Sequence, residues 1–303
     1  MKKLKNILLL LTILSLKAIP VSAVTSFELG DTTFTRTDAV DIASHQKWMT
    51  LEDFTSLKDS GVKYLIIKAS ENVDYENPYL AKHKDYAEAN GLAVASYHYS
   101  KYTDVESARA EARMFVETLK KNGLDENTLI FNDLEDEVTY KDKSEAQVVE
   151  NTKAFFDQLK ELGYNNIGLY TYANFKYRSG VEEILGKEDT WIAQYPNTPS
   201  VGGTYEVKWK DSGYGAWQYA SSMTLKGHRL DANIDYGMLA SRISLEDGTN
   251  WDTVTNTRTG KTKAEKDAER RKVTEDQIES IKKLQYNEEV RRIEKYILEN
   301  VDN

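Results

Sequence analysis

Two carboxyl side chains, separated by one residue, follow an apolar segment of the chain. Residues 129–134 form a predicted strand, from which Asp133 and Glu135 point to the same face, about 6.6 to 7 Å apart. Carboxyls this close cannot both ionise freely, so one keeps its proton near neutral pH while the other is charged. Cleavage of a glycosidic bond needs that combination, a proton for the leaving oxygen and a negative charge beside the positive sugar centre.

An acidic loop that only caps the following helix is the alternative interpretation of this motif. Glu137 also shares the face of Glu135 if the strand continues, so the sequence leaves the register open. Polar and aromatic residues at the ends of other predicted strands favour the catalytic interpretation, because those ends surround the active site of a barrel. Aromatic rings offer flat apolar faces to sugar rings, and amide and hydroxyl groups orient them. The strand-end residues are Asp41, Glu71, Tyr97, Tyr99, Tyr170, Tyr172, Gln194, Tyr195, Trp217, Gln218, Tyr219, Asp231 and Asn233.

The elements that position these residues follow the pattern of repeated β/α units. Between about residues 34 and 243, short apolar runs alternate with amphipathic stretches that begin at polar caps and end at Gly or Asn. The pattern predicts an α/β fold, a TIM-like barrel with a reduced helical half, (β/α)5β3, plus a C-terminal helical extension. The predicted helices cover residues 50–61, 78–90, 105–122 and 144–162, and the predicted strands cover 39–42, 64–69, 92–99, 129–134, 167–172, 191–194, 215–219 and 230–234.

Taken in order, the strand-end motifs resemble those of glycoside hydrolase family 25, the N-acetylmuramidase type of lysozyme. The similarity covers about residues 36–243. It implies a (β/α)5β3 barrel that hydrolyses the β-1,4 bond between N-acetylmuramic acid and N-acetylglucosamine in peptidoglycan, without a cofactor. The motifs are Asp41-Ile42-Ala43-Ser44, Lys68-Ala69-Ser70-Glu71, Tyr97-His98-Tyr99, Asp133-Leu134-Glu135, Trp217-Gln218-Tyr219 and Asp231-Ala232-Asn233.

The resemblance also assigns roles to the acidic residues. It makes Glu135 the general acid with Asp133 beside it, and Asp41 and Asp231 the other acids of the groove. The family's reaction is generally taken to retain the configuration of the sugar. Two positions along a strand separate the carboxyl groups by more than the roughly 5 to 5.5 Å found where one carboxylate is the nucleophile. Our hypothesis is therefore that the substrate's acetamido group takes part in the reaction and is oriented by Asp133.

This chain departs from the family's pattern in two places. Ala43 stands where Val-Ser or a similar pair commonly follows the first Asp of the family's motifs, and Asp136 and Glu137 are additional acids next to the fourth motif. The substrate-binding residues expected from the strand ends are Glu71, Tyr97, Tyr99, Tyr170, Tyr172, Gln194, Trp217, Gln218 and Asn233.

Composition divides the chain into five segments. Residues 1–23 have the lysines, short apolar run and Val21-Ser22-Ala23 end of a signal peptide, which predicts a secreted protein acting at the cell wall. Lys17, close behind the apolar run, leaves an uncleaved membrane anchor as the alternative. Residues 24–35 are a lead-in, 36–248 the catalytic barrel, 249–262 a polar linker and 263–303 a charged, amphipathic helical tail.

The tail has one apolar stripe at helical spacing. This pattern favours a helix that packs on the barrel or on itself, with binding of a protein partner as the alternative. No wall-binding repeat is recognisable after the barrel. The stripe consists of Tyr286, Val290, Ile293, Ile297 and Val301.

Composition also excludes several classes of function. The net charge of −9 disfavours nucleic-acid binding, because a phosphate backbone requires a basic surface. The absence of cysteine excludes disulfides, thiol nucleophiles and Cys-ligated zinc, and no two of the four histidines have the i, i+4 spacing of a metal site. No G-x-S-x-G motif of a serine hydrolase is present.

Two alternative functions are a chitinase-like enzyme and a glycan-binding barrel without enzyme activity. A chitinase-like barrel would show the motif D-x-x-D-x-D-x-E. Thr128 stands at the first aspartate position if that motif ends at Glu135, and Ile130 stands there if it ends at Glu137. A non-enzymatic barrel that binds glycan and anchors a cell-surface assembly is the second rival. Acidic residues on the first, fourth and eighth predicted strands argue against it.

Overall fold

The computed structural model describes residues 26–31, 34–196 and 204–243 of the 303-residue chain. The predicted leader, linker and helical tail lie outside the described residues, as do four residues of the lead-in. Within the described part, no helix is both long enough and apolar enough to cross a membrane.

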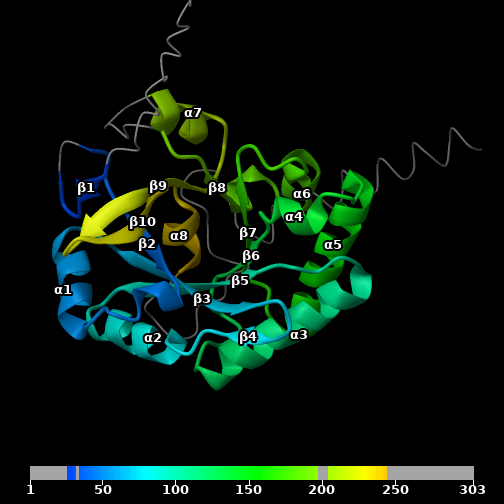
Figure 1. Cartoon of the computed structure of the whole chain (residues 1–303), viewed down its shortest axis with the longest axis horizontal. Coiled ribbons are helices and arrows are strands. Elements are labelled where there is room, and N and C mark those ends of the chain that lie inside the picture. The colour runs from blue at the N-terminus through cyan, green and yellow to red at the C-terminus, as the bar shows by residue number, and fades with distance from the viewer. Residues whose placement is uncertain (1–25, 32–33, 197–203, 244–303) are drawn as a thin grey trace, which may run out of the picture.

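The strands form a closed barrel, as the sequence predicts (Figure 1). Neighbouring strands pair in parallel from the first barrel strand to the seventh, and the eighth closes the ring by pairing antiparallel with both of its neighbours. A parallel pair at one edge (β1, Phe27–Glu28, with β9) and a short hairpin strand (β4, Tyr75–Glu76, with β3) are added outside the ring. The barrel strands are β2 (Ala39–Ile42), β3 (Tyr64–Glu71), β5 (Ala93–Tyr99), β6 (Ile130–Asp133), β7 (Ile167–Tyr172), β8 (Thr190–Ala193), β9 (Ala216–Leu225) and β10 (His228–Asp235).

The helices surround the strands, and the longer ones follow the first half of the barrel (Figure 1). β9 and β10 are joined directly by a hairpin, so the helical layer is thinner beside them. The fold therefore matches the predicted barrel with a reduced helical half. The helices are α1 (Leu51–Asp59), α2 (Leu80–Ala89), α3 (Val105–Lys121), α4 (Glu137–Tyr140), α5 (Glu145–Glu161), α6 (Arg178–Leu185), α7 (Thr204–Asp211) and α8 (Met238–Arg242), with 3-10 turns at Ser44–Gln46 and Lys187–Asp189.

Capping residues fix where the two longest helices begin. Asp104 accepts a hydrogen bond from the backbone N–H of Ser107 at the start of α3, and Ser144 accepts one from Gln147 at the start of α5. Each cap satisfies a backbone donor that the first turn of a helix leaves unpaired. The buried face of α3, which includes Phe115, then packs toward the barrel and α5.

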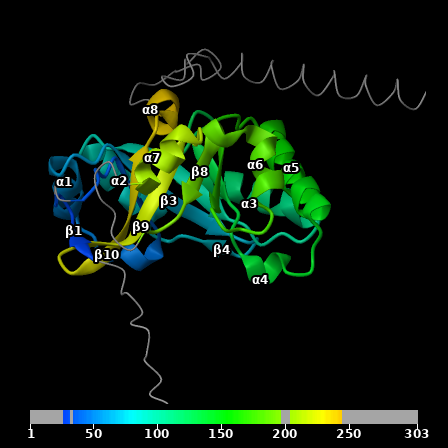
Figure 2. The same cartoon turned by 90° about the horizontal axis from the view of Figure 1, so that it is seen from above.

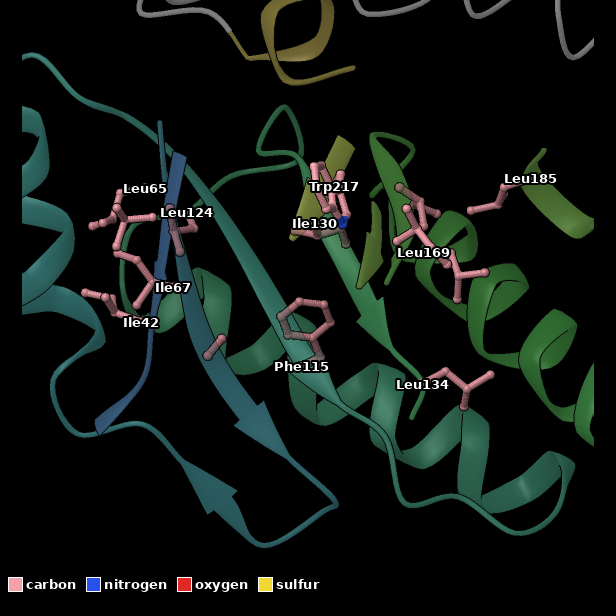
Figure 3. Close-up of a cluster of buried hydrophobic side chains, with 14 of the residues drawn as sticks. Ile42, Leu65, Ile67, Phe115, Leu124, Ile130, Leu134, Leu169, Leu185 and Trp217 are labelled. Atoms are coloured by element: carbon pink, nitrogen blue, oxygen red, sulfur yellow. The ribbon is translucent and has the colours of Figure 1, made fainter. Parts of the chain in front are cut away.

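Alternate strand residues divide the core into two clusters. The outer cluster lies between the strands and the helices and includes Leu65, Ile67 and Leu169 (Figure 3). The inner cluster fills the barrel and includes Phe131 and Trp191. This division follows from the period of two in a strand, which sends successive side chains to opposite faces.

The inner cluster closes one end of the barrel. Met238 and Leu239 of α8 belong to it, and Figure 2 shows α8 at the end of the molecule opposite β4 and α4. Gly168 leaves room inside for the ring of Phe131, because a Cβ at this glycine would lie 2.5 Å from Cε1 of that ring. The interior is therefore filled at the end closed by α8, and the carboxyl ends of the strands remain available for a site.

Candidate active site

A polar cavity of about 250 Å³ opens at the carboxyl ends of the barrel strands. Four acidic side chains from β2, the end of β6 and β10 line it: Asp41, Asp133, Glu135 and Asp231. The sequence motifs thus converge in space, although they are far apart in the chain. The other lining residues are Tyr97, Tyr170, Tyr172, Trp191, Tyr195, Gln218 and Ser221.

The backbone at the end of β6 places Asp133 and Glu135 on the same side. Leu134 between them packs in the outer cluster, and its N–H donates to the carbonyl of Tyr170 on β7 at 3.0 Å. The regular strand ends at Asp133, so Glu135 continues the alternation only through this last pairing with β7. Asp136 then caps α4 by accepting from the N–H of Val138. The helix settles the register, because exposed Glu137 belongs to its first turn and not to the strand.

The surroundings of the Asp133 and Glu135 pair favour the protonated form. Burial, reinforced by the negative charge of Glu135, raises the pKa of Asp133 well above its ordinary value. Burial also raises the pKa of Glu135 from 4.5 to about 7, against the effect of a hydrogen bond from Tyr170. Within the described part of the chain, Oδ1 of Asp133 and Oε2 of Glu135 have no hydrogen-bond partner. The pair can therefore hold a proton near neutral pH and offer it to a bound molecule.

The other two acids form a second pair across the closure of the barrel. Asp41 and Asp231 are direct partners in the antiparallel register of β2 and β10, and their side chains are hydrogen-bonded. Oδ1 of Asp41 also accepts from Nε2 of Gln218 at 2.9 Å and Nδ2 of Asn233 at 2.8 Å. Burial raises the pKa of Asp41 to about 6 despite these donors, and burial with the charge of Asp41 raises the pKa of Asp231. One proton can thus be shared between them.

Tyrosine hydroxyls and one amide connect the two pairs. Oε1 of Gln218 accepts from the hydroxyl of Tyr170 at 2.8 Å and from that of Tyr195 at 2.5 Å, and Tyr195 also bonds the hydroxyl of Tyr172 at 2.9 Å. These bonds orient the Gln218 amide so that its NH₂ group faces Asp41. Tyr195 was not among the expected binding residues, although its spacing of two from inward-facing Ala193 predicts that it points inward.

A smaller cavity, of about 200 Å³, borders the first one. It shares Glu135 and Tyr172 with the polar cavity and adds Glu137, Asn174 and Phe175. Glu135 therefore stands between two hollows, one on each side of its carboxyl group.

Two expected binding residues lie beside the polar cavity without lining it. The carboxylate of Glu71 pairs with Nζ of Lys68 at 2.5 Å. The ring of Tyr99 lies between two ammonium groups, with Nζ of Lys68 at 4.8 Å and Nζ of Lys101 at 4.7 Å from its centre. In the sequence, Lys68 belongs to the Lys68-Ala69-Ser70-Glu71 motif, but no local signal marks it as a functional residue.

Three further expected residues are placed away from the cavity surface. Asn233 is fully buried beneath it, where it donates to Asp41 and accepts from Nε1 of Trp191 at 2.9 Å. Trp217 packs in the outer cluster and donates to the carbonyl of Gln194, and neither side chain lines the cavity. The expectation that Trp217 faces the groove is wrong, because its neighbour Gln218 points inward and successive strand residues alternate.

A sequence model of the family described as glycosyl hydrolases family 25 matches residues 40–228, which is more than half of the chain. The chain belongs to glycosyl hydrolase family 25. The resemblance seen in the sequence motifs is thereby confirmed, and the matched residues span the barrel from β2 to the start of β10.

Relatives of this family 25 chain include lysozymes and endolysins. It is 30% identical over 184 residues to the autolytic lysozyme of Clostridium acetobutylicum, an alignment that covers 60% of this chain and 51% of the relative. The chain thus spans about half the length of this curated relative.

Two solved structures share the fold. The lysozyme from Streptomyces coelicolor superposes with a TM-score of 0.51 at 18% identity, covering 69% of this chain and 95% of that one. The catalytic domain of endolysin ply40 from bacteriophage P40 of Listeria monocytogenes has a TM-score of 0.50 at 25% identity, covering 64% and 90%. Both likenesses agree with the barrel described above.

The histidine of β5 in this family 25 barrel has a packing role. His98 is fully buried on the outer side of β5, where Nδ1 bonds Ser70 at 2.8 Å and Nε2 bonds Glu111 at 2.9 Å. Its ring stacks against Phe155. Among the described residues, no group of His, Asp or Glu is arranged to hold a metal ion.

Proposed function

We propose that this chain is a peptidoglycan hydrolase of the muramidase type, which cleaves the β-1,4 bond between N-acetylmuramic acid and N-acetylglucosamine. The observation that carries the proposal is the buried pair of Asp133 and Glu135, whose free oxygens line a polar cavity. Membership of family 25 and similarity to an autolytic lysozyme support the same reaction.

Glu135 supplies the proton in the proposed reaction. With a pKa near 7, it is protonated when substrate binds and gives its proton to the glycosidic oxygen as the bond to the sugar carbon breaks. The two cavities that meet at Glu135 give room for a sugar on each side of the broken bond. The resulting carboxylate then takes a proton from the water that completes hydrolysis.

In the proposed reaction, Asp133 acts on the acetamido group of the substrate. The substrate's acetamido oxygen attacks the sugar carbon, and Asp133 orients the acetamido N–H and stabilises its developing positive charge. Water then opens the cyclic intermediate, so the sugar keeps its configuration. A covalent sugar adduct on Asp133 in a trapped intermediate would contradict this step.

The second acid pair and the aromatic residues hold the sugar in place. Asp41 and Asp231 offer hydrogen-bond acceptors and a shared proton to sugar hydroxyls, and Gln218 fixes the position of Asp41. The aromatic rings of the cavity provide apolar faces, as carbohydrate sites require. These rings are Tyr97, Tyr170, Tyr172, Trp191 and Tyr195.

The place of action follows from the substrate. Peptidoglycan lies outside the membrane, so the chain acts at the cell wall after export by the leader at residues 1–23. From the change in composition we propose a domain boundary near residue 248, with residues 263–303 outside the barrel domain.

Digestion of purified peptidoglycan tests the proposed activity. The full chain is expected to create new reducing ends that carry muramic acid, and Glu135→Gln is expected to create none above background. New ends that carry glucosamine would identify a glucosaminidase and overturn the assignment of the bond. Binding of peptidoglycan without any cleavage would favour a glycan-binding barrel instead.

A further inference from the structure

Five charged or aromatic side chains form a continuous chain of contacts beside the cavity, which we call the rim chain. Glu71 pairs with Lys68, and the ammonium of Lys68 lies over the ring of Tyr99. Lys101 lies over the same ring and pairs with Asp136. Carboxylate, ammonium, ring, ammonium and carboxylate thus follow one another from β3 across β5 to the cap of α4.

The backbone of β3 fixes Lys68 at the inner end of the rim chain. Ile66 belongs to the inner cluster, so Lys68 two residues later points to the same side of the strand. A register shift between Lys68 and Ser70 then brings Glu71 to its side chain, three residues on. Such bulges redirect side chains next to sites.

Lys68 is held in this position by strong local contacts. Its side chain is only 14% exposed, which is costly for an ammonium group unless it is paired. Glu71 provides the counter-charge, and the rings of Tyr99 and Tyr75 provide cation–π contacts at 4.8 and 5.4 Å. The positive charge is therefore fixed in space before substrate binds.

The register of the strands places the ammonium group of Lys68 close to the catalytic acids. Lys68 is the direct neighbour of Tyr97 on β5, and Tyr99 is the direct neighbour of Asp133 on β6. Burial raises the pKa of both Asp133 and Glu135, and the charge of Lys68 opposes that rise in each case. The titratable and charged groups around the pair are Asp41, Lys68, Glu71, Tyr97, Tyr99, Asp136, Tyr140, Tyr170, Tyr172, Tyr195 and Asp231.

We propose that Lys68 is a positioning residue of the reaction, held by Glu71 and Tyr99 so that its ammonium stabilises the carboxylate that Glu135 becomes on proton transfer. The inference rests on the proposed function, since it assigns a role within the same site. It needs no contact between Lys68 and the substrate.

Activity against pH separates this role from a structural one. Lys68→Met removes a positive charge, so both acids keep their protons to higher pH, and the whole pH–activity profile moves about one pH unit toward alkaline pH. Lys68→Arg keeps the charge and the position of the profile. Glu71→Gln removes a negative charge from the surroundings of Asp133 and moves the profile toward acid pH. Lower activity with an unmoved profile in Lys68→Met would overturn the proposal.

Direct titration of Glu135 decides the proposal without any enzyme activity. In the full chain labelled with ¹³C at glutamate carboxyls, Lys68→Met is expected to raise the titration midpoint of Glu135, and an unchanged midpoint would overturn the inference. If wild type releases no reducing ends, the proposed function fails while this titration still decides the role of Lys68. If Lys68→Met does not fold, Lys68→Gln carries the test, with a higher midpoint of Glu135 expected and an unchanged midpoint refuting the inference.

Discussion

The catalytic acid should destabilise the barrel at alkaline pH, and Glu135→Gln should relieve that cost. Burial raises the pKa of Glu135 from 4.5 to about 7 in the folded chain, so ionising this group is harder when folded than when unfolded. At about 1.4 kcal/mol per pKa unit, complete ionisation costs the folded state about 3 kcal/mol. Glutamine has nearly the same shape and never ionises, so the variant escapes this cost.

The pH dependence has a definite direction. The folded pKa lies above the unfolded one, so the stability that Glu135 contributes is fully present below pH 4.5 and is lost as pH rises through about 7. Wild type and Glu135→Gln should therefore unfold at similar urea concentrations at pH 4. At pH 8 the variant should be more stable by about 3 kcal/mol, a large part of the stability of a typical domain.

Urea unfolding followed by tryptophan fluorescence at pH 4, 6 and 8 measures this difference. Glu137→Gln is the matched control, because Glu137 is exposed in the first turn of α4, and it should change stability little at any pH. A gain in Glu135→Gln that is equal at all three pH values, or absent at pH 8, would refute the reasoning. It would mean that burial does not raise the proton affinity of this carboxyl.

Three further outcomes follow from the structure. Gly168→Ala places a Cβ 2.5 Å from the ring of Phe131, so urea unfolding should show a loss of about 2 kcal/mol, and unchanged stability would show that the barrel interior has spare room. Tyr170→Phe removes a hydrogen bond that favours ionised Glu135, so the alkaline limb of the activity profile should move up by about one pH unit, and a downward shift would contradict this. Deletion of residues 250–303 should leave hydrolysis of soluble glycan fragments intact, and unfolding of the truncated chain by circular dichroism would show that the domain boundary is misplaced.

The barrel could be predicted from the sequence because its pattern is strong. Alternating apolar runs and capped amphipathic stretches located all eight strands, and the helix capped by Ser144 begins where its sequence predicts. The short helices α4 and α6 to α8 were not given bounds, because segments of four to eight residues show too little periodicity.

The cavity was predictable only in part. The acids were found because an apolar strand ending in carboxyls is a local signal. The prediction for Trp217 was wrong because the sequence does not show which residues at this strand end face inward. Gln218 faces the cavity, so its neighbour Trp217 faces the outer cluster. The rim chain depends on a bulge in β3 and on pairing between strands, and neither is visible in a single sequence.

The initial rate of reducing-end release from purified peptidoglycan, compared between Glu135→Gln and Glu137→Gln, tests the central claim most directly. Of these two glutamates, Glu135 has a buried carboxyl oxygen without a partner in the described chain and Glu137 is exposed, so the substitution at Glu135 removes the proton donor. We predict a fall of about a hundredfold or more in Glu135→Gln and a change of only a few-fold in Glu137→Gln, because Glu137 lines the smaller cavity but supplies no proton. Equal rates in the two variants would contradict the assignment of Glu135 as the catalytic acid.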